Sequence, residues 1–242
     1  GKESRYQIEA HFVQDIDRYR IDRREQGSPS YKPIHLPGTT GEETYSLEDL
    51  STQVPQLVIS VQQTFNNEAS AHLEIHIFLP LELMNQDVDC WMFHDTERPL
   101  GHEYNVVLRY AERLSRNYRK YPNWVDKWQH HQDLLQECAL QAFVSGDNQH
   151  LRGLPNALND VDQTIVGLKV IQAPLQVERG GIFEVLYWSG LPLAIWGRCN
   201  LTNSCNETEL DQVLRAAQRL ELLPDQVQRT RCAALEHEQD CH

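Results

Sequence analysis

Apolar and polar positions alternate most clearly between residues 73 and 79, which read LEIHIFL. Every second residue from Leu73 to Leu79 is apolar, with Glu74 and His76 in between. This period of two predicts a strand with one apolar face. A second apolar run of strand length covers Tyr104 to Leu108, and we expect a helical segment directly after it, over Arg109 to Arg116.

Three further segments predict a β-α-β unit in the last third of the chain. Thr164 to Ile171 is apolar and β-branched, Phe183 to Trp188 has the composition of a short helix, and Leu193 to Trp196 is a short apolar strand. Two strands joined through a helix normally run parallel. We expect Leu73 to Leu79, Tyr104 to Leu108 and Leu193 to Trp196 to share one sheet.

Helical spacing first appears after Ser46. Ser46 and Asp49 are spaced as in a near capping box, and the apolar residues that follow repeat at helical intervals up to Phe65. Pro55 lies inside the pattern and predicts a kink or a split into two helices.

Two more helices are predicted further along. Pro122 to Phe143 carries Trp128 and Cys138 on one side, an aromatic stripe typical of a core-facing surface. Thr208 to Leu222 has a continuous apolar stripe and is closed by Pro224. For Asp225 to His242 we expect a shorter helix and a polar tail.

The N-terminal segment predicts a β-hairpin. Arg5 to Gln14 alternates, Tyr19 to Arg23 continues as a second strand, and Glu25 to Tyr45 is rich in Gly and Pro and predicts a loop. The predicted fold is a single α/β domain over residues 1–242. It has this hairpin and loop in residues 1–45 and a body in 46–242 with a mixed central sheet and helices on both faces.

The net charge and the short apolar runs argue against two classes of function, nucleic-acid binding and membrane insertion. The net charge of −13 over 242 residues argues against a general nucleic-acid binder, because neutralising phosphates requires a basic face. No apolar run reaches the roughly 18 residues that span a bilayer, and the polar N-terminus does not resemble a secretion signal. We therefore expect a cytoplasmic protein without membrane contact. Because the chain begins at Gly1 rather than Met, we expect it to be part of a longer protein.

No strong motif predicts catalysis or a cofactor. Nucleotide-binding glycine loops, nucleophile elbows and zinc-protease motifs are absent from the sequence. The six cysteines lack zinc-ligand spacing, and Cys90 and Cys138 lie in apolar patterns, so we predict free, buried thiols and neither a metal nor a disulfide. A solvated loop is the simplest interpretation of the acidic residues near position 95.

Charged and aromatic residues gather near the ends of the predicted strands, where α/β sheets tend to bind ligands. Arg109 and Arg113 would lie one helical turn apart if a helix follows the strand. With Arg198 they would need an anion, either Asp89 and Glu112 in a structural network or a bound phosphate or carboxylate. The candidate ligand- or partner-binding residues are Asp89, Trp91, His102, Arg109, Glu112, Arg113, Trp196 and Arg198.

Four motifs in order carry a resemblance to a known family. They are LEIHIFLPLELMNQDVDCW, LGHEYNVVLRYAERL, the pair Trp124 and Trp128, and GLPLAIWGR. Together they resemble the C-terminal domain of vWA-MoxR-associated proteins (VMAP-C), over roughly residues 5–235. Asn105 stands where a Pro is usual in that pattern, Tyr110 where a Ser is common, and Trp91 follows Asp89 at a shorter spacing.

The resemblance implies a role in bacterial NTP-dependent conflict systems, which act in antiviral defence. Its partners would be a MoxR-type AAA+ ATPase, a von Willebrand A-domain protein and a fused effector or adaptor domain. The predicted function is a non-enzymatic regulatory or sensing module that controls an attached effector such as a peptidase. A hydrolase acting on nucleotide or peptide through the strand-end Asp, His and Arg cluster is the alternative, and a purely structural scaffold is a third.

Overall fold

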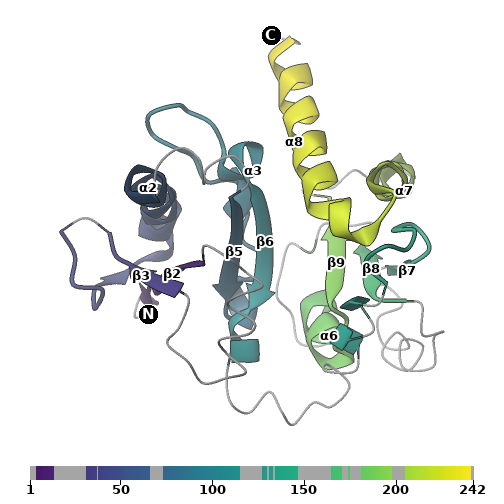
Figure 1. Ribbon diagram of the computed structural model, residues 1–242, viewed down its shortest axis with the longest axis horizontal. Coiled ribbons are helices and arrows are strands. Elements are labelled where there is room, and N and C mark those ends of the chain that lie inside the picture. The colour runs from purple at the N-terminus through teal and green to yellow at the C-terminus, as the bar shows by residue number, and fades with distance from the viewer. Residues whose placement is uncertain are drawn as a thin grey trace. The chain divides into compact units, whose positions relative to one another are not determined.

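The computed structural model of the chain describes residues 4–13, 31–36, 38–65, 73–114, 127–129, 131–132, 134–146, 165–170, 174, 181–197 and 205–240 (Figure 1). The chain divides into two compact units. The first comprises Gly1–Glu74 and Val88–Tyr104, and the second comprises Ile75–Asp87 and Asn105–His242. The α/β class is confirmed, whereas the single domain over 1–242 stays a prediction.

The first unit contains two small antiparallel sheets. β1 (Tyr6–Gln7) pairs with β4 (Thr44–Tyr45), and β2 (Ala10–Val13) pairs with β3 (Tyr31–Ile34). The hairpin-like N-terminal pairing is thus confirmed, with β3 as the partner of β2, whereas the predicted second strand, Tyr19 to Arg23, lies outside the described residues. The prediction of a loop over Glu25 to Tyr45 is wrong for β3 and β4, because cross-strand hydrogen bonds override the local preference of Gly and Pro for turns.

Helix α2 (Leu47–Phe65) begins at the predicted capping box. The Asp49 N–H donates to Ser46 Oγ at 3.1 Å, and the Ser46 N–H donates to Asp49 Oδ2 at 3.0 Å. Pro55 lies inside this one helix and is fully buried, so the predicted split does not occur.

The rest of the first unit is a compact segment next to α2. The 3-10 turn η3 (Val88–Cys90) packs against α3 (Leu100–Glu103). Gln62 on α2 donates to the Tyr104 hydroxyl, whose ring meets Phe93 edge-on with 6.0 Å between the ring centroids. These contacts fasten residues 88–104 to the helix.

The second unit begins with a pair of strands, β5 (Glu74–Leu79) and β6 (Asn105–Tyr110). Two contacts, His76 with Arg109 and Leu81 with Glu112, join residues separated along the chain by 33 and 31 positions. A nearly constant separation is the signature of parallel strands, because both chains advance in the same direction. Figure 1 draws both arrowheads at the same end of the pair.

A three-stranded parallel sheet forms the other half of the second unit. Its order is β7 (Phe143–Gly146), β8 (Gly167–Val170) and β9 (Leu193–Trp196). Helix α6 (Ile182–Ser189) connects β8 to β9, which confirms the predicted β-α-β unit.

Helices cover both faces of this sheet. The register places Ser145, Lys169 and Ile195 side by side on one face, and Lys169 reaches Asp211 on α7 (Cys205–Ala217). The next residue along β9, Trp196, points to the other face and meets Phe183 of α6.

The C-terminal helices close the second unit. After α7, the 3-10 turn η6 (Leu220–Leu222) leads into α8 (Leu223–Asp240), which packs against α7 and β6. Asn105 at the start of β6 donates to Asp225 Oδ1 at 2.5 Å. Helix α8 is longer than the short helix and polar tail predicted for this end of the chain.

Two other predictions about the body are wrong. Among the described residues, β5 and β6 form one sheet and β9 belongs to another, because strand pairing depends on contacts distant in sequence. The helix predicted to run to Phe143 also fails: residues 134–142 form turns, and Phe143 begins β7.

Candidate binding surface

The eight candidate residues are divided between the two units. Asp89, Trp91 and His102 belong to the first, whereas Arg109, Glu112 and Trp196 belong to the second. The side chain of Arg113 and the whole of Arg198 lie outside the described residues. The predicted cluster of three arginines therefore stays a prediction.

The candidates of the first unit lie around one turn. Asp89 is buried within η3, and Trp91 joins that turn to α3: its N–H donates to Val88 at 3.1 Å, and its carbonyl accepts from Leu100 at 2.7 Å. The Nδ1 atom of His102 is 3.5 Å from the Glu103 carboxylate. Through these contacts Trp91 holds the short elements η3 and α3 together.

Arg109 occupies the strand β6 and not the helix that we predicted. The strand continues to Tyr110, because the Tyr110 hydroxyl donates to the Phe183 carbonyl at 2.9 Å and the ring packs edge-on against Tyr187. The helical spacing proposed between Arg109 and Arg113 is consequently wrong.

The guanidinium of Arg109 contacts a histidine and a tryptophan. Its Nε–H donates to His76 Nδ1 on β5 at 2.7 Å, so that ring nitrogen carries no proton in this contact. Its Cζ atom lies 5.8 Å from the ring centroid of Trp128, within the range of a cation–π interaction. Arg109 thereby connects β5, β6 and the segment around Trp128.

Trp128 in turn stacks on His131, with 5.1 Å between ring centroids and 27° between ring planes. His131 is buried, and this burial, aided by the positive charge of Arg109, lowers its pKa to about 4. The imidazole is neutral at pH 7.

These contacts define an exposed surface that we name the Arg109 patch, formed by His76, Phe78, Arg109 and Trp128. Phe78 follows His76 by two residues and so shares its face of β5. Phe78 is 40% exposed and Trp128 38% exposed, so two large aromatic side chains of the patch face solvent.

Sequence reasoning missed most of this patch. We assigned Trp128 and Cys138 to a core-facing helical stripe, but both are exposed, because the helix does not continue through residues 134–138. Cys90 is exposed as well, so the prediction of buried thiols is wrong for these two. The sequence feature that could have indicated the patch is His76, a polar residue on the outer face of a predicted strand.

Glu112 binds the backbone after β5 and does not pair with Arg109. Its Oε1 accepts from the Leu81 N–H at 2.9 Å, while no residue in the described part of the chain bonds its buried Oε2. Leu81 follows β5 and Glu112 follows β6, so this bond ties together the turns at the ends of two parallel strands.

Trp196 belongs to the packing between the parallel sheet and α6. Its ring meets Phe183 edge-on, with centroids 5.7 Å apart. The same sheet holds an ion pair that sequence reasoning missed: Lys169 Nζ lies 2.5 Å from Asp211 Oδ1, with side chains only 7% and 19% exposed. The sequence feature that could have indicated this ion pair is the single Lys in the apolar run VGLKVI.

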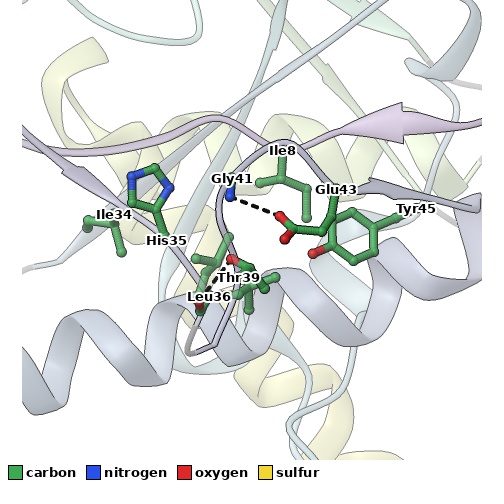
Figure 2. A pocket seen from close by; sticks show the side chains of 9 residues that line it. Ile8, Ile34, His35, Leu36, Thr39, Gly41, Glu43 and Tyr45 are labelled. Carbon is green, nitrogen blue, oxygen red and sulfur yellow. Dashed lines mark hydrogen bonds between the residues drawn. The ribbon is translucent and has the colours of Figure 1, made fainter.

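A small hollow in the first unit is lined by Ile8, Ile34, His35, Leu36, Thr39, Gly41, Glu43, Tyr45 and Leu57 (Figure 2). The Glu43 carboxylate accepts from the Thr40 and Gly41 N–H groups at 2.8 and 2.9 Å, and these bonds lower the pKa of Glu43. Gly41 has φ of 83°, and a Cβ there would lie 2.7 Å from His35 Nδ1. The Glu43 carboxylate therefore serves as the acceptor for two backbone N–H groups of its own turn.

Two other kinds of functional feature are absent from the described residues. These residues contain no group of three His, Cys, Asp or Glu side chains able to hold a metal ion. Within the same ranges, no helix is both long and apolar enough to cross a membrane.

The structure is of the mixed α/β class, and its second unit carries an exposed surface with an arginine and aromatic side chains. Residues 13–242 match the family model of the vWA-MoxR associated protein C-terminal domain, VMAP-C, and the chain belongs to this family. The family name indicates association with vWA and MoxR proteins. No curated protein and no solved structure matched the chain.

Proposed function

We propose that this chain is a non-enzymatic regulatory module of a cytoplasmic bacterial conflict protein. It binds a partner protein or trigger and controls an attached effector, such as a peptidase. Its partners are a MoxR-type ATPase and a vWA protein, in line with the family name.

The observation that carries this proposal is the Arg109 patch in a member of a family named for association with other proteins. Arg and Trp are enriched among the residues that contribute most to protein–protein binding, and aromatic side chains are enriched at interfaces generally. Here Arg109 and Trp128 are in contact, with exposed Phe78 on the neighbouring strand. A surface of this composition favours a role in partner recognition.

Reconstitution of the full-length parent protein tests the proposal. The parent would be mixed with a vWA protein and a MoxR-type ATPase from the same organism, and complex formation would be followed by size-exclusion chromatography. We expect at least one of them to co-elute and to change the rate at which the attached effector acts. Separate elution of both proteins, with effector activity unchanged in their presence, would contradict the proposed function.

A further inference from the structure

We propose that the small hollow beside Glu43 receives the ammonium group of a lysine from a partner protein. This inference rests on the proposed function, because it names a side chain by which the partner is recognised. The Glu43 carboxylate would bind the ammonium group, and the methylene groups of the lysine would pack on the apolar side chains that line the hollow (Figure 2).

The carboxylate of Glu43 is an anion that no cationic side chain of the described residues neutralises. Its Oε1 accepts from the Thr40 N–H at 2.8 Å and from the Thr40 hydroxyl at 3.0 Å, and its Oε2 accepts from the Gly41 N–H at 2.9 Å. These bonds lower the pKa of Glu43, so the group is charged at pH 7. A carboxylate has about four acceptor positions, and the three donors leave one of them on Oε2.

The same hydrogen bonds orient the carboxylate before a partner arrives. Gly41, which donates one of them, has a φ of 83°, a backbone conformation that glycine adopts readily. An acceptor that is already held in place loses little entropy on binding. Its contact with an ammonium group should therefore contribute more than an ion pair between two flexible surface side chains.

The size of the hollow selects the type of cation. Its volume is about 10 Å³, which is room for one group of the size of a water molecule. The lysine ammonium is a compact point charge, whereas the guanidinium of arginine is planar and larger. A divalent metal ion would need several oxygen ligands, and Glu43 supplies the only carboxylate among the described residues that line the hollow.

The apolar lining accounts for the stem of the lysine. Ile8 and Ile34 are partly buried, so part of their surface remains available for contact, and the buried Leu36 and Leu57 complete the apolar lining. Lysine packs its methylene groups along apolar surface while its charged end lies in a polar place. The net charge of −13 also attracts a basic partner at long range.

Binding of the parent protein to the purified vWA protein and to the MoxR-type ATPase, measured by isothermal titration calorimetry, tests the site. We expect Glu43→Gln to weaken the binding of at least one of them by about tenfold, since it removes a hydrogen bond to a charged group. Glu42→Gln is the matched control, because Glu42 is an exposed neighbour that does not line the hollow. This control should bind as the wild type does.

A second variant separates loss of the ammonium contact from loss of the turn. Ile8→Phe keeps Glu43 and its hydrogen bonds but places a larger side chain in the lining of the hollow. It should weaken binding to a similar extent. Melting temperatures establish which variants are folded, and Ile8→Phe decides the test if Glu43→Gln does not fold.

Modification of the partner's lysines tests the contact with the wild-type parent protein. Acetylation removes the charge of lysine, whereas dimethylation keeps the charge and enlarges the ammonium group. We expect both treatments to weaken binding to the wild type. Both should have a smaller effect on binding to Glu43→Gln, in which the contact is already lost.

The outcomes distinguish the two proposals. Binding of neither protein by the wild type overturns the proposed function and this inference with it. Wild-type binding that folded Glu43→Gln retains, or that dimethylation of the partner leaves unchanged, overturns only the lysine site. An equal loss in Glu42→Gln would also overturn it, because the general negative charge of the surface would then be responsible.

Discussion

The two sheets of the second unit use their residues in opposite ways. In the sheet of β7, β8 and β9, helices cover both faces, and even a lysine is buried, in an ion pair with Asp211. In the pair of β5 and β6, His76 and Phe78 are exposed to solvent on the outer face, and Arg109 is partly exposed. The first arrangement contributes stability, whereas the second keeps aromatic and charged side chains at the surface. Substitutions in the two sheets should therefore affect different measurements.

The largest stability effect is expected at the buried ion pair. Lys169→Ala leaves Asp211 without its cation in a mostly buried position, and should lower the free energy of unfolding by about 3 to 5 kcal/mol. Urea denaturation followed by circular dichroism measures this change. The double variant Lys169→Met with Asp211→Leu should be closer to the wild type, because no charge remains buried. Equal losses in the single and double variants would show that the packing of the side chains matters more than their charges.

A smaller loss is expected where the parallel sheet is packed most tightly. A Cβ at Gly167 would lie 2.5 Å from the ring of Phe143 on the neighbouring strand. Gly167→Ala should therefore cost about 1 to 3 kcal/mol, because the core must shift to admit the methyl group. The same denaturation experiment applies, with Gly197→Ala as the control, since a Cβ there meets nothing within 4 Å. A stable Gly167→Ala protein would mean that the Phe143 ring moves aside easily.

The stability of the region under the Arg109 patch should depend on pH. The folded chain lowers the pKa of His131 to about 4 from the ordinary value of 6.5, mainly through burial. The unfolded chain thus binds a proton more readily, so this contribution is fully present above pH 6.5 and is lost as the pH falls towards 4. His131→Asn should flatten the profile of melting temperature over that range. His94→Asn, at an exposed histidine, should keep the wild-type slope.

The smallest stability effect is expected at Arg109 itself. Arg109→Gln removes a hydrogen bond to His76 and a cation–π contact in a partly exposed place, together about 1 kcal/mol. Binding, in contrast, should be affected strongly. If Arg109→Gln instead lowers the free energy of unfolding by about 3 kcal/mol or more, Arg109 has a structural role like that of Lys169.

Local patterns in the sequence predicted most of the second unit's elements. The alternation in β5, the apolar run in β9 and the β-α-β order were all confirmed, and in the first unit so was the capping box at Ser46. These features depend on residues close together in the chain. The end of β6 was misplaced, because Tyr110 is held in the strand by the distant Phe183 carbonyl.

The candidate site was predicted only in part. Arg109 was expected on a helix after the strand but lies within the strand β6. Its contacts with His76 and Trp128 were not predicted, because these residues lie 33 positions before it and 19 positions after it. Pairing of Glu112 with arginine was one of two alternatives left open by the sequence, and in the structure Glu112 accepts a hydrogen bond from the Leu81 N–H. Such choices follow from the register of two strands, which no local pattern specifies.

By itself, the sequence determined the α/β class, the family and the positions of most strands and helices, because these depend on short-range periodicity and on ordered motifs. Only the tertiary structure decided which strands pair, which charged residues are buried and which aromatic side chains remain exposed. Those outcomes depend on the burial of distant segments against one another. The same physical reason separates Lys169, buried beneath α7, from Arg109, which lies at the surface beside Trp128.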